Sequence, residues 1–107
     1  MLNELVSIFE VVDRVLEKRK VNAAQRIRDK VLVAIYELGN KGSHAVTSAE
    51  LETKGGFSKL QIFDAIESAK SSDWIIDASS FDGMAWMLKQ KAIYYIEGLL
   101  ESKGTGQ

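Results

Sequence analysis

Two copies of one helix-start signal, eleven residues apart, restrict the fold more than any other feature of this chain. Thr47 is followed three residues later by Glu50, and Ser58 is followed three residues later by Gln61. This spacing is a capping box: the hydroxyl accepts a hydrogen bond from the third residue's backbone N–H, and the Glu or Gln side chain accepts one from the backbone of the capping residue. The sequence therefore predicts two consecutive helices within residues 47–71.

A pair of glycines separates these two predicted helices. Gly55 and Gly56 can adopt the positive φ angles that end a helix and redirect the chain. A short helix, a tight glycine turn and a longer helix form a helix-turn-helix. The apolar residues of the segment have the spacing of a shared buried face: Leu51, Phe57, Ile62, Ile66 and Ala69.

The composition fits one ordinary globular domain. The 107 residues are 46% hydrophobic and 27% charged. There is no apolar run near the roughly 18 residues of a membrane span, and no signal-peptide pattern. The sequence has no cysteine, so it has neither disulfides nor thiolate metal ligands. We expect a cytoplasmic protein.

The sequence offers no pattern of residues typical of catalysis or cofactor binding. His44 is the one histidine, and there is no GxSxG-type turn. Asp73, Asp77 and Asp82 lack the spacing of a calcium-binding loop, and the diglycine turn is not followed by the GK[ST] of a phosphate-binding loop. We expect no enzymatic activity, no cofactor and no metal.

Two further helices are predicted before the capping boxes. Apolar residues recur at helical spacing over residues 2–20, and Asn22 with Gln25 predicts the cap of a helix over 23–38. The first helix buries its apolar stripe either in its own domain or against a second copy. We therefore assign 1–21 to an N-terminal helix and candidate dimerisation element, 22–101 to the main domain, and 102–107 to a disordered tail. The second helix has its predicted buried stripe at Ala24, Ile27, Val31, Ala34, Ile35 and Leu38.

The chain changes to a strand pattern after the second capping box. Residues 74–76 and 85–88 are strand formers, and Asp82–Gly83 between them suits a tight hairpin turn. Residues 90–101 return to helical spacing and predict a last helix. Strand alternation predicts that Trp74, Ile76 and Ala78 share a face, and that Met84, Trp86 and Leu88 share a face.

This order of elements resembles the winged helix-turn-helix superfamily. The residues that carry the resemblance are TSAEL at the first helix start, GGFS in the turn, IFDAIESA in the second helix, WII and AWML in the hairpin, and LKQKAIYYIEG at the end. The resemblance covers residues 23–101 and implies an α+β fold, mostly α, with an extra long N-terminal helix and a C-terminal helix. It also implies a small protein that binds double-stranded DNA, a transcriptional regulator acting as a homodimer. The N-terminal helix is the first candidate for the dimer contact, and the last helix is the second.

In winged-helix proteins that bind DNA, the second helix of the pair enters the major groove with residues near its N-terminus. By this resemblance Gln61 would read adenine through both amide atoms, Lys59 would reach a guanine or a phosphate, and Ser58 would bind a phosphate at the helix N-terminus. The full set of contact candidates on this helix is Ser58, Lys59, Leu60, Gln61, Phe63 and Asp64.

A basic segment before this motif supports DNA binding. Residues 14–30 contain seven basic residues against Glu17 and Asp29, a local excess of five positive charges in a chain of net charge −1. Such an excess is typical of a phosphate-binding surface, and the alternative is a solvated helix junction. We add Arg26, Arg28 and Lys30 to the predicted DNA contacts. The other basic residues of the segment are Arg14, Lys18, Arg19 and Lys20.

The predicted hairpin and the second helix also carry features that disfavour DNA. The hairpin has Asp77 and Asp82 and no lysine or arginine at its tip, whereas phosphate contacts need cations. Leu60 and Phe63 fall on or near the groove-facing side of the helix, where apolar residues suit a protein partner better. The alternative function is a protein–protein interaction module that binds through Leu60 and Phe63 without DNA.

Overall fold

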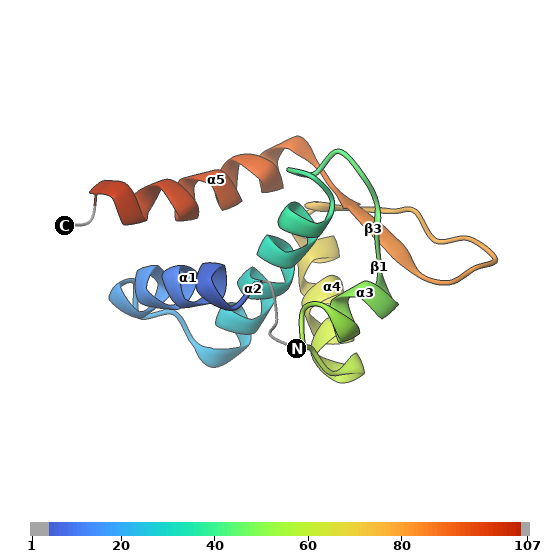
Figure 1. The fold of residues 1–107 in the computed structure, drawn as a ribbon, viewed down its shortest axis with the longest axis horizontal. Coiled ribbons are helices and arrows are strands. Elements are labelled where there is room, and N and C mark those ends of the chain that lie inside the picture. Colours follow the sequence, from blue (N-terminus) through green and yellow to red (C-terminus); the bar gives the residue numbers. More distant parts are fainter. Residues whose placement is uncertain (1–4, 106–107) are drawn as a thin grey trace.

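The computed structural model describes residues 5–105, which form a mostly helical α+β fold (Figure 1). The predicted fold class is confirmed: five helices and a three-stranded antiparallel sheet occur in this part of the chain. The elements in order are α1 (Val6–Lys18), α2 (Ala23–Leu38), β1 (Val46–Thr47), α3 (Ser48–Thr53), α4 (Lys59–Ser71), β2 (Ile75–Asp77), β3 (Ala85–Leu88) and α5 (Gln90–Thr105).

Helix α2 is the centre of the molecule. Its six consecutive residues 31–36 are all buried, since α2 contacts all four other helices and β3. In Figure 1, α1 and α5 lie on one side of α2, while α3, α4 and the hairpin lie on the other. The predicted cap is confirmed, because Asn22 Oδ1 accepts from the backbone N–H of Gln25 at 2.8 Å. Of the predicted stripe, Ala24 is exposed, because it lies in the first turn at the surface.

Both predicted capping boxes are present. The Thr47 hydroxyl accepts from Glu50 N–H at 3.1 Å, and the Ser58 hydroxyl accepts from Gln61 N–H at 3.1 Å. Both reciprocal bonds, from the Thr47 and Ser58 N–H groups to the Glu50 and Gln61 side chains, are 3.0 Å long. These bonds fix where α3 and α4 begin.

The two glycines of the turn have different roles. Gly56 has φ +77°, the left-handed conformation predicted for the turn, whereas Gly55 is not among the positive-φ residues. A Cβ at Gly55 would lie 2.7 Å from the Leu51 carbonyl oxygen and 2.8 Å from the Phe57 ring. Gly55 is therefore required by close packing, and only Gly56 by backbone conformation.

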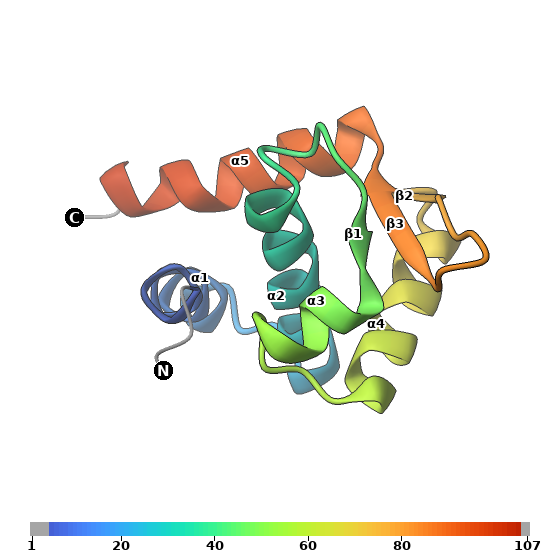
Figure 2. The same cartoon turned by 45° about the vertical axis from the view of Figure 1, so that its right-hand side comes forward.

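The sheet has the strand order β1-β3-β2, and Figure 2 shows β1 and β3 running beside α2 from the α5 end towards α3. Ser80 and Gly83 exchange backbone hydrogen bonds, so the hairpin turn is Phe81–Asp82 and the prediction of Asp82–Gly83 is wrong by one residue. Ile75 pairs with Leu88, and both are buried, whereas Ile76 and Met84 are exposed. The register therefore places Ile75 and Leu88 on the buried face of the sheet.

Helices α1 and α5 pack against each other and against α2. Val12 and Leu16 of α1, with Ile96 and Leu99 of α5, are fully or almost fully buried within one chain. Part of the predicted helix over 2–20 lies outside the described residues, since these begin at residue 5. Helix α5 continues to Thr105, into the segment predicted as a disordered tail, and residues 106–107 lie outside the described part.

Candidate nucleic-acid interface

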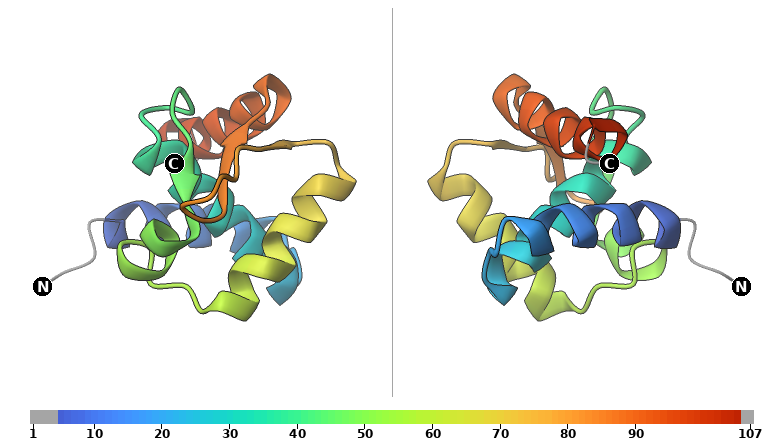
Figure 3. Two further views of the ribbon diagram at one scale, coloured as in Figure 1. Left: turned by 90° about the vertical axis from the view of Figure 1, so that its right-hand side faces the viewer. Right: turned by 90° about the vertical axis from the view of Figure 1, so that its left-hand side faces the viewer.

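Helix α4 presents an outer face that the rest of the described chain leaves uncovered. Leu60 and Phe63 are 69% and 57% exposed, and Ser58, Lys59 and Asp64 are exposed with them. The opposite face, with Ile62, Ala65, Ile66 and Ala69, is buried and holds the helix on the core. The left view of Figure 3 shows α4 along one edge of the molecule. The capping box and the α3–α4 turn thus place the predicted contact residues at an accessible helix start.

The same capping box limits what Gln61 can do. Its Oε1 atom accepts the hydrogen bond from Ser58 N–H, and its side chain is half-buried. Bidentate reading of adenine needs both the amide oxygen and the amide nitrogen, so it would require that bond to break. The Ser58 hydroxyl oxygen is also used as an acceptor, but its O–H can still donate to a phosphate.

The three basic residues predicted on α2 are paired with carboxylates of the chain. Arg26 Nη2 lies 3.4 Å from Asp13 Oδ1, and Lys30 Nζ lies 3.3 Å from Asp13 Oδ2. These two side chains remain 35% and 25% exposed, so solvent still reaches them. Arg28 binds Asp29 Oδ1 through Nε at 3.0 Å and Nη2 at 2.9 Å. Asp13 and Asp29 neutralise part of this positive charge. The net positive charge at the surface of α2 is therefore smaller than the excess of five counted over residues 14–30.

Asp29 belongs to a buried network that the sequence does not predict. Its side chain is fully buried and accepts from the Tyr95 hydroxyl at 2.6 Å as well as from Arg28. The Arg28 guanidinium lies 5.0 Å from the centre of the Trp74 ring, and Trp74 packs on Tyr95 at 4.8 Å between centroids. Burial and the hydrogen bond to Asp29 raise the pKa of Tyr95. This network joins α2, α5 and the start of the hairpin.

A groove of about 430 Å³ between α2 and α4 brings together several of the predicted residues. Arg28 of α2 lines it with Gln61 and Asp64 of α4, and Leu60 also contributes. Asn22, just before α2, lines the same groove. The α1–α2 turn, which contains the basic residues 19–20, therefore lies near the start of α4 (Figure 3). Arg26 and Lys30 are directed to α1 instead.

A second groove, of about 400 Å³, lies on the other flank of α4. It is lined by Lys59 and Phe63 of α4 and by Met84 of the hairpin, together with residues of α3. Leu60 and Phe63 thus line grooves on opposite flanks of α4, and the predicted contact residues are divided between them.

The hairpin is acidic and has an apolar tip. Phe81 in the turn is fully exposed, and Asp77 and Asp82 are exposed near it. Hydrogen bonds from Ser79 hold the pKa of Asp77 below its ordinary value, so this carboxylate is charged at neutral pH. The negative charge predicted for the hairpin is therefore present in the folded chain.

Residues 5–105 lack two other structural features. None of the helices there has the length and apolar character needed to cross a bilayer. The same residues contain no group of three or more His, Asp or Glu side chains placed to hold a metal ion. His44 is exposed in the loop before β1, and it is not part of that strand.

Comparisons with known proteins relate the chain to one solved structure. No protein-family model and no curated protein matches the sequence. The fold is similar to a structure of Bordetella bronchiseptica BpsR, which concerns the regulation of that protein's DNA binding by 6-hydroxynicotinic acid. The two chains are 14% identical, the match covers 92% of this chain and 69% of BpsR, and the TM-score is 0.62. This chain therefore shares the fold of BpsR.

Proposed function

We propose that this chain is a winged-helix DNA-binding protein, a transcriptional regulator that acts as a homodimer. Helix α4 would enter the major groove and the β2–β3 hairpin would be the wing. The observation that carries the proposal is the uncovered face of α4, held at its N-terminus by the Ser58 capping box beside a projecting hairpin. The fold shared with BpsR, a protein whose DNA binding is regulated, supports it.

The proposed contacts have distinct roles. Ser58 and the start of α4 bind a phosphate, and Lys59 reaches a base edge or a phosphate. Arg26 and Lys30 exchange part of their pairing with Asp13 for phosphate oxygens, since all three side chains are partly exposed. Arg28, Gln61 and Asp64 shape the groove beside α4, with Arg28 and Gln61 acting as positioning residues. In a two-fold dimer the two α4 helices would lie about 34 Å apart, one turn of DNA.

A salt titration of binding to duplex DNA tests the proposal. Native protein should bind at about 50 mM salt with a log–log slope that reports released counterions, and Lys59→Gln should reduce that slope by about 1. Lys41→Gln is the matched control, because Lys41 is an exposed lysine in the loop after α2. No binding at low salt, or equal slopes for the native protein and Lys59→Gln, would contradict the proposal.

The alternative function, a protein-interaction module, is supported by one specific observation. Leu60 and Phe63 are large apolar residues exposed on the outer side of α4, each beside one of its two grooves, and Phe63 lines the groove that reaches the acidic hairpin. Replacing both by serine should abolish binding of a protein partner. In the DNA-binding protein the same double change should leave the salt slope unchanged, because it removes no cation.

A further inference from the structure

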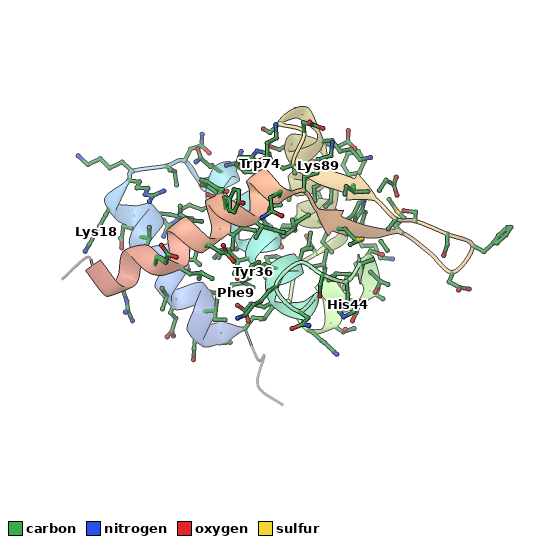
Figure 4. The ribbon with its side chains drawn as sticks, turned by 90° about the horizontal axis from the view of Figure 1, so that it is seen from above. Phe9, Lys18, Tyr36, His44, Trp74 and Lys89 are labelled. Carbon is green, nitrogen blue, oxygen red and sulfur yellow. The ribbon has the colours of Figure 1, made fainter. Side chains whose placement is uncertain are left out.

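Helix α5 carries an exposed stripe on the side opposite its packed face. Lys91, Tyr94, Gly98 and Glu101 follow the three- and four-residue spacing of a helix–helix seam, and all four are exposed. Tyr94 is 65% exposed, whereas Ala92, Ile96 and Leu99 on the other side are buried. Figure 4, seen from above, shows α5 lying across the near face of the described chain with no other element over it. We call these four residues the α5 stripe.

Packing within the described part of the chain gives no reason for a glycine at position 98. A Cβ added there would meet nothing within 4 Å, so no described neighbour demands a glycine. Glycine in a helix interior is less favourable than alanine, and its usual purpose is to let another backbone or side chain approach closely. Lys91 is also unfavourably placed for an isolated helix, because the first turn of a helix prefers acidic residues.

The α5 stripe is complementary to itself when two copies run antiparallel. Lys91 and Glu101 each lie five residues from Ile96, and Tyr94 and Gly98 each lie two residues from it. A two-fold axis at Ile96 therefore places Lys91 opposite Glu101 of the second copy, and Tyr94 opposite its Gly98. The ring of Tyr94 fills the space that the missing Cβ leaves, and the opposite charges meet at both ends.

We propose that the α5 stripe is a homodimer seam, in which α5 crosses α5 of a second copy in antiparallel orientation at the level of Ile96, with Gly98 of each copy facing Tyr94 of the other. This deepens the proposed function, which rests on a dimer, and names α5 as its interface in place of α1. One helix crossing falls at the small end of the interface range, below about 1,200 Å², so the dimer should be reversible and depend on concentration. The existing pair of Lys91 with Asp73, at 3.8 Å and exposed, is weak enough to be exchanged.

Charge reversal with sedimentation equilibrium tests this seam on the full chain. Native protein should show a monomer–dimer equilibrium between about 5 µM and about 500 µM, a range that brackets micromolar affinity. Lys91→Glu and Glu101→Lys should each raise the dissociation constant about tenfold, because the axis turns two attractive pairs into repulsive ones. The double variant should return to within about threefold of native affinity, because its pairs are attractive again.

Gly98→Leu and an α1 variant complete the test. Gly98→Leu should abolish the dimer while the far-ultraviolet circular dichroism spectrum of the monomer is unchanged, since position 98 is exposed and an added Cβ meets no atom within 4 Å. Glu10→Lys is the matched control, a charge reversal at an exposed position of α1. A native monomer at every concentration, a double variant as weak as the single ones, or a dimer lost only in Glu10→Lys would overturn the seam.

The seam and DNA binding can fail separately. A protein that binds DNA but stays monomeric in free solution at every concentration contradicts the α5 seam and leaves the DNA contact of α4 standing. A dimer that follows the charge-reversal pattern but binds no DNA contradicts the proposed function and supports the seam.

Discussion

The two sides of α2 use charged residues in different ways. On the α1–α5 side, Asp13 pairs with two cations and Asp29 is buried between Arg28 and Tyr95. On the α4 side, Lys59 and Asp64 are exposed and form no ion pair with the described part of the chain. On the first side these particular charges are paired within the chain and stabilise the scaffold, whereas on the second side Lys59 and Asp64 are available to a partner. Position in the fold, and not the local density of charge in the sequence, decides which charged residues are available.

The largest expected effect comes from breaking the scaffold side at Arg28. Arg28→Ala leaves the buried Asp29 carboxylate with the Tyr95 hydroxyl but without its cation, and should lower the free energy of unfolding by about 3–5 kcal/mol. Arg26→Ala is the matched control and should cost about 0–1 kcal/mol, because its pair with Asp13 is partly exposed. Urea denaturation measures both. Equal losses of unfolding free energy in the two variants would show that the buried pair of Arg28 with Asp29 stabilises the fold no more than the exposed pair of Arg26 with Asp13.

A smaller effect is expected on the α4 side at Gln61. Gln61→Ala removes one half of the capping box and should lower the free energy of unfolding by about 0.5–1 kcal/mol. If Gln61 positions the helix, the variant should bind all DNA sequences somewhat more weakly and keep the same order of preference. Competition binding with a panel of duplexes measures this. A change of preference at one adenine would instead assign base reading to Gln61.

The scaffold side should also show a pH dependence, confined to alkaline conditions. Burial, followed by the hydrogen bond from its hydroxyl to Glu97 at 2.9 Å, raises the pKa of Tyr36 to about 12. The folded state therefore favours the neutral phenol, so this contribution is complete below the unfolded pKa near 10 and is lost as the pH rises to about 12. Tyr36→Phe should flatten stability over that alkaline range. An equally steep alkaline loss of stability in Tyr36→Phe would contradict this assignment.

Local signals in the sequence predict much of the fold. The capping boxes at Thr47 and Ser58 and the cap at Asn22 are each complete within four residues, so their geometry follows from spacing alone. The hairpin is also predicted, but the position of its turn is wrong by one residue, and which face of the sheet is buried is not predicted. The register depends on the pairing of Ile75 with Leu88, and the sequence between them allows a shift of one residue.

The candidate site is harder to predict, because residues distant in the sequence determine which of its charged side chains are paired and which are free to bind a partner. Asp29 is buried with Tyr95, which lies 66 positions further along the chain, and no local pattern indicates this pair. Asp13 lies just before the basic segment and still pairs with Arg26 and Lys30 across the α1–α2 turn. The sequence does contain a signal against adenine reading by Gln61. The capping box and the adenine contact both need the Oε1 atom of Gln61, so the two predicted roles exclude each other.

Amide chemical-shift mapping with a duplex DNA tests the central claim most directly. If α4 and the hairpin are the contact surface, the largest shifts on adding DNA should fall in residues 58–64 and 77–84, and should weaken as salt is raised. The scaffold residues 31–36 should change little, since they are buried. Shifts confined to α1 and α5, or no shifts at low salt, would contradict DNA recognition by α4.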